Sequence, residues 1–340
     1  FLTSGISVGA GAAVAAGSAL PAAAQQEEIK WDIEYDVVVV GAGATGLPAA
    51  IAARDQGASV LVVEANFDVG GKMMLSGGQI RIGGGNRLQK EYGVEDSPEQ
   101  VFLDWIRHDS KYSRYSDREI IRVFADHNLE AFDFLEANGI TEWYELAGPS
   151  QIESVARRVT PHEWPVREEV VAHDQNRRGS GIVRPLERSA RNKGVEFLLE
   201  HRMIKLHREG HLEGRVIGIT AVKVDRFFNS LDTTVNIRAR KGVILATGGH
   251  SGNLSLRRVF DPRLTEEYQP HGTVWAFENG DGEIQAMAVG ASLWATANQT
   301  TEIGSALDKG RLGVENNYVR GYIKPESVAF FRARAMGLEV

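Results

Sequence analysis

The fold is decided by residues 35–64, which read YDVVVVGAGATGLPAAIAARDQGASVLVVE. The run 37–40 contains only valine and is too short for a helix, which is typical of a strand buried on both faces. An alanine-rich segment follows, and we expect it to form a helix that ends at Gly57. Residues 60–63 repeat the buried-strand pattern, and Glu64 closes it. The stretch therefore predicts a strand, a helix and a second strand of an open α/β sheet.

The turn between the first strand and the helix, GAGATG at residues 41–46, has the spacing of a dinucleotide-binding fingerprint. Gly41 allows the tight turn, Gly43 lets the backbone approach a pyrophosphate, and Gly46 lets helix and strand pack closely. The helix N-terminus offers amides and the positive end of its dipole to the pyrophosphate. A carboxylate at the end of the second strand can accept hydrogen bonds from ribose hydroxyls. The residues expected to bind a dinucleotide are Gly41, Ala42, Gly43, Ala44, Thr45, Gly46, Glu64 and Ala65. The alternative is a glycine-rich turn in another kind of α/β protein.

Composition sets broad limits on function. The chain has 340 residues, of which 43% are hydrophobic, and a formal net charge of −7. This length allows about two domains, and the acidic balance is unlike a nucleic-acid-binding surface, so no nucleic-acid partner is expected. The absence of cysteine excludes disulfides, thiolate-ligated clusters and cysteine nucleophiles. No metal site is expected, because His201, His207 and His211 lack carboxylate or cysteine company.

The first 24 residues carry no charge and are mostly small and apolar. They end in Ala22-Ala23-Ala24, which resembles a cleavage site, and a polar stretch occupies 25–30. The run is too rich in alanine and glycine for a convincing membrane span, so we expect part of a secretory signal and no stable membrane insertion of the mature chain. The opening FLTSG resembles the residues after the arginine pair of a twin-arginine signal, which predicts a periplasmic or exported protein whose signal starts before Phe1. An uncleaved tail or anchor is the alternative.

A second glycine-rich segment, VGGKMMLSGGQIRIGGGN at residues 69–86, holds seven glycines among eighteen residues. So many glycines indicate backbone that lies close against something flat or extended. A nicotinamide-only Rossmann domain does not need a second loop of this kind, whereas the longer FAD molecule does. A third motif, KGVILATGG at residues 241–249, predicts a buried strand at 243–245 that runs into a loop.

These motifs carry a family resemblance. GAGATG, Glu64 and GGKMMLSGG resemble the FAD-dependent oxidoreductase family of fumarate reductase and succinate dehydrogenase flavoproteins and 3-ketosteroid dehydrogenases. The spacing within 71–86 and the segment 93–100 are most similar to the ketosteroid branch. The resemblance covers about residues 31–296 and implies an α/β, two-dinucleotide-binding-domain flavoprotein with a Rossmann-like FAD domain, a β-meander and a partial capping domain.

The expected organisation has three parts: a signal-like segment and linker at 1–30, an FAD-binding domain at 31–296 and the start of a capping domain at 297–340. A chain that stops there looks like a fragment of a longer protein. Within the FAD-binding domain we expect helices at 97–106, 116–137, 183–192 and 281–289, and Asp281 is expected to cap the last one. We expect a strand at 195–200 and exposed meander strands at 215–224 and 234–240. A long irregular loop is expected at 141–180.

The resemblance also places residues along the cofactor. They are Gly71, Lys72, Met73, Ser76, Gly77 and Gly78 in the second loop, Met203 and Ile204 beside the adenine, Ala246, Thr247, Gly248 and Asn253 in and after the third motif, and Gly280 and Asp281 in a Gly-Asp-Gly element. The second loop contains no histidine, so the histidyl–FAD bond of some relatives is not expected, and FAD is predicted to be non-covalent.

Fumarate-type reductases carry a His-Pro-Thr segment after the Gly-Asp-Gly helix, whereas residues 295–310 read ATANQTTEIGSALDKG. This departure argues against small dicarboxylates. The resemblance then implies α,β-dehydrogenation of a carbonyl compound, or the reverse reduction, by hydride transfer at flavin N5, with a small-molecule substrate and an unknown electron donor or acceptor. Tyr144 is the candidate catalytic residue, as the group that handles the proton. The alternatives are reduction of an unsaturated acid, an NAD-dependent dehydrogenase and a non-catalytic flavin-binding protein.

Overall fold

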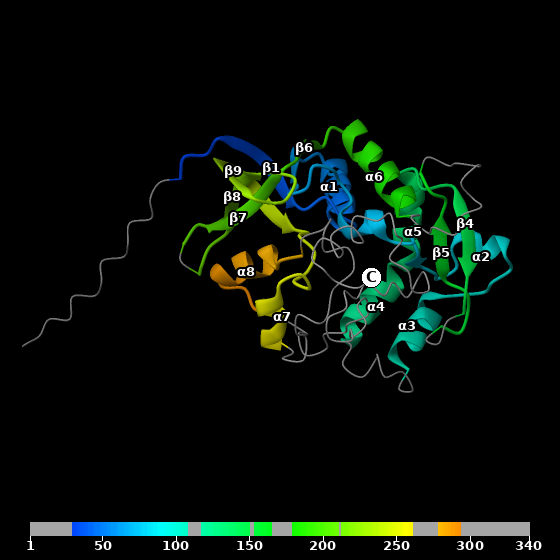
Figure 1. Ribbon diagram of the computed structural model, residues 1–340. Helices are drawn as coiled ribbons and strands as arrows, with labels where there is room; N and C mark the ends of the chain where they lie inside the picture. Colours follow the sequence, from blue (N-terminus) through cyan, green and yellow to red (C-terminus); the bar gives the residue numbers. More distant parts are fainter. Residues whose placement is uncertain are drawn as a thin grey trace, which may run out of the picture. The chain divides into compact units, whose positions relative to one another are not determined.

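A computed structural model describes residues 29–107, 117–149, 153–164, 179–210, 212–260 and 278–293. The expected signal and the expected capping segment at 297–340 lie outside these ranges. The elements, shown in Figure 1, run in the order β1 (Ile33–Val40), α1 (Gly46–Asp55), β2 (Val60–Val63), η1 (Gly71–Leu75), β3 (Ile80–Arg81), α2 (Arg87–Glu91), α3 (Pro98–Ile106), α4 (Arg118–Asp126), α5 (Asn128–Ala137), β4 (Trp143–Ala147), β5 (Arg158–Pro161), α6 (Ser180–Asn192), β6 (Glu196–Leu198), β7 (His201–Arg208), β8 (Val216–Val224), β9 (Ser230–Leu245), α7 (Leu254–Phe260) and α8 (Asp281–Ala288). None of the helices in the described ranges has the length and apolar composition that a membrane-crossing segment requires.

The main sheet has six strands in the order β6-β2-β1-β9-β8-β7 (Figure 1). β1 pairs in parallel with β2 on one side and with β9 on the other, and β6 extends the parallel part beyond β2. β7, β8 and β9 are antiparallel neighbours and form the expected meander. The predicted α/β arrangement, with α1 between the two parallel strands β1 and β2, is confirmed.

Strand β9 belongs to both parts of this sheet. Its first half pairs with β8, and its second half pairs with β1 through registers such as Val40 with Leu245. The sequence predicted two separate strands because charged residues interrupt the apolar pattern. The structure joins them, since Arg240 projects to Glu34 (Nη1 to Oε1, 2.9 Å) and Asp36 (Nε to Oδ1, 3.1 Å) instead of ending the strand.

The meander is also less exposed than the sequence predicted. Ile219 and Ala221 of β8 are fully buried and belong to an apolar cluster with Val38 of β1, Leu61 of β2 and Leu206 of β7. Ile219 and Ala221 are two residues apart and so share one face of β8, and the residues that cover this face come from distant parts of the chain.

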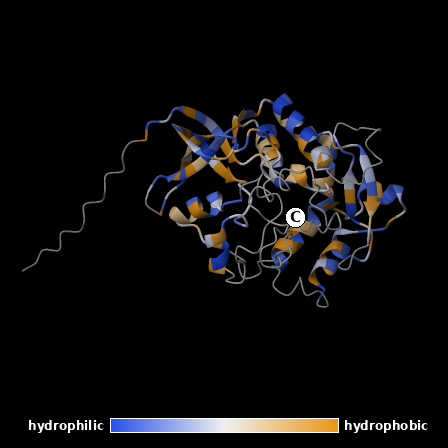
Figure 2. Ribbon diagram, viewed as in Figure 1, coloured by the Kyte–Doolittle hydropathy of each residue, from blue (hydrophilic) through white to orange (hydrophobic). Residues whose placement is uncertain are grey.

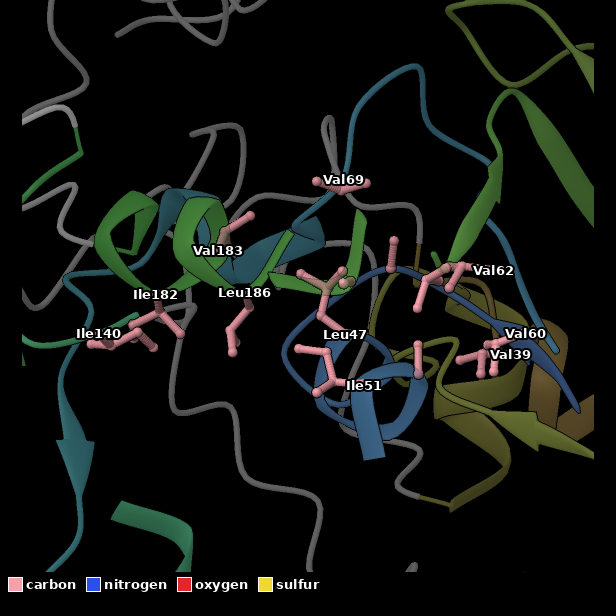
Figure 3. Packing of buried hydrophobic residues seen from close by; sticks show 14 of the residues in the cluster. Val39, Leu47, Ile51, Val60, Val62, Val69, Ile140, Ile182, Val183 and Leu186 are labelled. Atoms are coloured by element: carbon pink, nitrogen blue, oxygen red, sulfur yellow. The ribbon is translucent and has the colours of Figure 1, made fainter. Parts of the chain in front are cut away.

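A second apolar cluster lies between α1, the parallel strands and α6. Figure 3 shows Leu47 and Ile51 of α1 beside Val39, Val60 and Val62, with Ile182, Val183 and Leu186 of α6 in the same cluster. All of these side chains are essentially inaccessible to water. In Figure 2 the helices carry both orange and blue residues, as expected for elements that bury one side only. Packing within this cluster fixes the position of α1 against β1 and β2.

The segment expected as a long irregular loop contains two strands. β5 pairs with β3 on one side and with β4 on the other in a small antiparallel sheet of the order β3-β5-β4, with Ile80 opposite Val159 and Trp143 opposite Pro161. Trp143 stacks on Phe132 of α5 with ring centroids 5.2 Å apart. The prediction was wrong because β3 and β5 are far apart in sequence, and such pairing leaves little local pattern.

The helix expected over 116–137 is two helices, α4 and α5, separated at His127. Asn128 is buried directly after this break, and its side-chain oxygen accepts a hydrogen bond from the Gly83 amide while its Nδ2 donates to Phe124 O at 3.3 Å. These contacts tie the start of α5 to the glycine-rich loop.

A buried ion cluster joins α3, β5 and the loop after β3. Arg157 donates to both oxygens of Asp96 (Nη2 to Oδ1 and Nε to Oδ2, 2.7 Å each) and to Asp104 (Nη1 to Oδ2, 2.6 Å). No side chain of the three is more than 1% exposed. Gly84 N also donates to Asp96 at 2.8 Å, and a methyl group at Gly83 would lie 2.4 Å from the same carboxylate. The glycines at 83–85, the last run of glycines in the second motif, are therefore required by this cluster.

We expect Arg157→Met to lower the free energy of unfolding by about 3–5 kcal/mol, because Asp96 and Asp104 would stay buried without their cation. Arg122→Met is the control: it removes an exposed ion pair with Glu99 and should cost less than about 1 kcal/mol. Urea denaturation of the two variants measures the difference, and equal losses would contradict the role given to Arg157.

Candidate cofactor site

A cavity lies at the carboxyl ends of β1, β2 and β9, which is where open α/β sheets place their ligands. It encloses about 1040 Å³ of space, open solvent at its mouth included. The predicted cofactor residues that line it are Gly41, Gly43, Ala44, Thr45, Glu64, Ala65, Gly71, Lys72, Met73, Met203, Ala246, Thr247, Gly248 and Asp281. The three sequence motifs therefore converge on one site.

Two glycines of the first motif are required by the fold itself. A methyl group at Gly41 would lie 2.3 Å from the carbonyl oxygen of Ala246, and one at Gly46 would lie 1.8 Å from that of Gly41. Backbone hydrogen bonds fix this contact: Gly41 N donates to Val63 O at 2.7 Å, and Ala246 N donates to Val40 O at 2.8 Å. β1, β2 and β9 therefore meet at the first turn with no room for a side chain.

Gly43 is different, because the protein leaves space beside it. The nearest atom to a methyl group at Gly43 would be Gly70 O, 4.0 Å away, although Gly43 lines the cavity. The first turn of α1 carries no acidic residue, so the positive end of the helix dipole is not neutralised there. A bare backbone at a helix N-terminus fits the pyrophosphate of a dinucleotide, which needs close approach to main-chain amides.

Glu64 holds the first turn to the end of β2. Its Oε2 accepts from Ala42 N at 2.7 Å, and its Oε1 accepts from Asn66 N at 2.8 Å. Burial raises the pKa of Glu64 above its ordinary value, and the amide hydrogen bonds oppose this without cancelling it. Ala42 itself is fully buried under this contact and does not line the cavity.

Two ion pairs stand at the cavity wall. Lys72 Nζ contacts Glu278 Oε2 at 2.5 Å and Ser251 Oγ at 3.1 Å, which joins the second motif to the segment before α8. Arg202 of β7 donates to Asp281 in a two-pronged contact (Nε to Oδ2, 2.7 Å; Nη2 to Oδ1, 2.6 Å), and this carboxylate raises the pKa of Arg202.

The Arg202 contact corrects one prediction. Asp281 does not cap α8; the N-cap position is Gly280, whose φ of 75° places it in the left-handed region, and no side-chain cap forms. The carboxylate expected to cap the helix is taken by the guanidinium of Arg202 instead.

The second motif divides into parts with different roles. Gly71, Lys72 and Met73 line the cavity, whereas Ser76 and the two glycines after it do not. Ser76 Oγ donates to Met73 O at 2.8 Å, and Ser76 O accepts from Gly179 N at 3.1 Å, so this part of the loop rests on the start of α6. Gly46, Gly77, Gly78, Ile204, Asn253 and Gly280 also stand outside the cavity wall.

The remaining predicted residues have positions of their own. Ile204 is 41% exposed. Asn253 accepts from Leu256 N at 2.9 Å and donates to Asn279 O at 2.9 Å, so it holds the turn after β9 to the segment before α8. Tyr144 lies on β4, 42% exposed, with its ring edge-on to His162 at 5.5 Å. It does not line the cavity, and its catalytic role stays a prediction.

Among the lining residues that the sequence missed are His201, Phe228 and Glu278. His201 and Glu278 lie next to motifs without belonging to them, and Phe228 sits in the β8–β9 turn, where the sequence shows only a break between strands. The adjacency of His201 to Met203 was the one available signal, because alternate residues of a strand share a face.

Residues 36–302 match the family model described as FAD binding domain. The chain belongs to the FAD-binding domain family. The expected family membership and the α/β flavoprotein fold are confirmed, and FAD is the cofactor for which the cavity is built.

The similar proteins include both reductases and dehydrogenases. The acrylate reductase flavoprotein subunit of Shewanella woodyi is 30% identical over 335 residues, which cover 95% of this chain and 60% of that protein. The 3-oxosteroid 1-dehydrogenase of Mycolicibacterium smegmatis is 28% identical over 327 residues, covering 76% and 54%. The crystal structure of 3-ketosteroid-Δ4-(5α)-dehydrogenase from Rhodococcus jostii RHA1 with 4-androstene-3,17-dione matches with a TM-score of 0.64 at 29% identity, covering 77% of this chain and 55% of that one. The chain spans about half the length of the curated relatives it matches.

The two kinds of glycine in the first motif should respond differently to alanine. Gly43→Ala should fold as the wild type does and lose most of its bound FAD, because its methyl group would project only into the cavity. Gly46→Ala should instead lower the melting temperature of the cofactor-free protein, because its methyl group meets the Gly41 carbonyl. Thermal melting of cofactor-free protein and absorbance of bound flavin separate the two effects. A Gly43→Ala variant that is destabilised and still fully loaded with FAD would contradict this prediction.

Proposed function

We propose that the protein is a FAD-dependent oxidoreductase that acts on a carbon–carbon bond next to a carbonyl group. The observation that carries this proposal is the cavity at the strand ends, where three separate motifs meet and where Gly43 leaves the backbone bare. An NAD-dependent dehydrogenase would need the first motif only. The convergence of Lys72 and Gly248 on the same cavity favours the longer cofactor.

The residues on the wall would divide the work of holding FAD. The amides around Gly43 and Thr45 suit the pyrophosphate, and Glu64 suits the adenosine ribose. Gly248 and Met73 would lie toward the flavin. When bound, FAD accepts or donates a hydride, and the chain supplies its orientation and an environment from which water is excluded.

We further propose that FAD is held without a covalent bond. The chain has no cysteine, and the second motif has no histidine or tyrosine that could form one. Flavin that leaves the precipitated protein completely in acid would agree with this, whereas yellow colour retained in the pellet would contradict it.

Two substrate classes fit this chemistry. The acrylate reductase is named for an unsaturated acid and the 3-oxosteroid dehydrogenase for a ketone. Both cations on the described part of the cavity wall, Lys72 and Arg202, are already paired with carboxylates. This pairing favours an uncharged ketone over a carboxylate, so a ketone is the main proposal and an unsaturated acid the second.

We propose that the electron partner is a separate donor or acceptor.

We also propose that the protein is exported, because the uncharged segment 1–24 ends in three alanines. A mature N-terminus at Gln25 in the exported fraction is the observation that checks the export proposal, and an unprocessed protein found only in the cytosol would remove it.

Anaerobic mixing of the full-length protein with a 3-ketosteroid, a cyclic ketone, succinate and lactate should bleach the flavin with a ketone and not with succinate. Bleaching by succinate alone would overturn the ketone class, and reoxidation of the reduced protein by acrylate would favour the unsaturated acid.

Tyr144→Phe should slow bleaching of the flavin by about 100-fold if the phenol of Tyr144 handles the proton. Tyr92→Phe, at an exposed position at the end of α2, is the control. An unchanged rate in Tyr144→Phe would clear that residue of a role.

A further inference from the structure

We propose that Phe228 is the stacking surface for the adenine ring of the cofactor. This inference rests on the proposed binding of FAD and adds a residue that none of the motifs contains. It starts from the position of Phe228 in the wall of the cavity, although the residue belongs to the turn between β8 and β9 and not to the strand ends.

Two kinds of charged group line the cavity: Glu64, which suits the adenosine ribose and so marks what we call the adenosine end, and Lys72 in its pair with Glu278. His201 joins the adenosine end, because its amide donates to the Glu64 carbonyl at 2.9 Å. A base attached to a ribose at Glu64 would therefore lie on the His201 side.

The turn that carries Phe228 is fixed to this same end. Val224, the last residue of β8, donates from its amide to Glu200 O at 2.8 Å, directly before His201. Arg226 in the turn lies over the ring of Phe67 at 5.6 Å, and Phe67 is three residues beyond Glu64. Two independent contacts thus hold the turn beside the adenosine end.

The backbone of the turn is built to aim Phe228 at the cavity. Phe228 has a φ of 63°, a left-handed conformation that costs a bulky residue about 1–2 kcal/mol and that glycine or asparagine adopts more readily. Asp225 holds this conformation: its Oδ1 accepts from Phe227 N at 2.8 Å and from Asn229 N at 2.9 Å, and its carbonyl accepts from Phe228 N at 2.9 Å.

The ring of Phe228 lies in the cavity wall at a strained backbone position, whereas its neighbour Phe227 is 68% exposed and does not line the cavity. An aromatic ring held at a strained position on a cavity wall suits a planar ligand in the cavity. The purine of FAD is the planar group that the adenosine end would receive.

Stacking of a base on an aromatic side chain contributes about 1–3 kcal/mol, which corresponds to about 5- to 140-fold in affinity. The loss should be the same for every ligand that contains the adenine, because the flavin half does not touch Phe228. ADP is therefore a probe of the adenosine end alone.

The test uses full-length protein from which FAD has been removed, titrated calorimetrically with FAD and with ADP. Phe228→Gly removes the ring and tolerates the positive φ, so it keeps the turn. Phe228→Trp keeps a stacking surface, and Phe227→Gly makes the same change at the neighbouring residue outside the cavity wall.

The inference requires that Phe228→Gly weakens the binding of FAD and of ADP by the same factor of about 5 or more. Phe228→Trp and Phe227→Gly should stay within about twofold of wild type, and the absorption spectrum of bound flavin should be unchanged. The melting temperature of cofactor-free Phe228→Gly should be no lower than that of wild type. Wild-type affinity in Phe228→Gly, or an equal loss in Phe227→Gly, overturns the stacking role alone. A wild-type protein that binds neither FAD nor ADP overturns the proposed cofactor and the stacking role together.

Discussion

No side chain fits where β1, α1 and β9 meet, and the site depends on this constraint. The methyl groups that alanine would add at Gly41 and Gly46 fall 2.3 Å and 1.8 Å from backbone carbonyl oxygens. Because the backbones touch, β1 pairs with β9 up to Val40 and Leu245, and α1 starts immediately beyond the sheet. The N-terminus of α1 is thereby held at the wall of the cavity, where its amides can meet a ligand. Packing of Leu47 and Ile51 against the strands keeps it there (Figure 3).

The charged residues on the cavity wall support this arrangement in another way. Lys72 and Arg202 come from different segments, and each is neutralised by a carboxylate near α8. The two pairs tie the second motif and β7 to neighbouring residues of one segment, Glu278 and Asp281, on the cavity wall. An anionic cofactor would then be bound by backbone amides and the helix dipole more than by side-chain cations. Amides that the sheet already holds in place lower the entropy cost of binding.

The sequence was most informative where the decisive contacts are local. The β1–α1–β2 unit and the cofactor role of the first motif can be derived from residues that are neighbours in the chain. The contact of Asn128 with the glycine-rich loop, the sheet formed by β3, β4 and β5, and the continuity of β9 depend on partners far away in sequence. The second motif shows both cases: Gly71 faces the cavity as expected, whereas Gly83 is fixed by the buried Arg157 cluster, which no local pattern reveals.

The same distinction separates the cofactor from the substrate. FAD contacts can be read from motifs because the pyrophosphate binds to the backbone, and backbone geometry is written in short runs of glycine. A substrate is recognised by side chains brought together from separate elements. Tyr144 illustrates the difficulty, since the sequence places it near a family position, but its strand belongs to the small sheet and its ring packs against His162. Phe228 illustrates the converse, because an aromatic residue without a motif is carried into the cavity wall by a turn whose geometry Asp225 sets. Residues that choose the substrate in this family are therefore to be sought by their position on the cavity and its cover, not by their place in a motif.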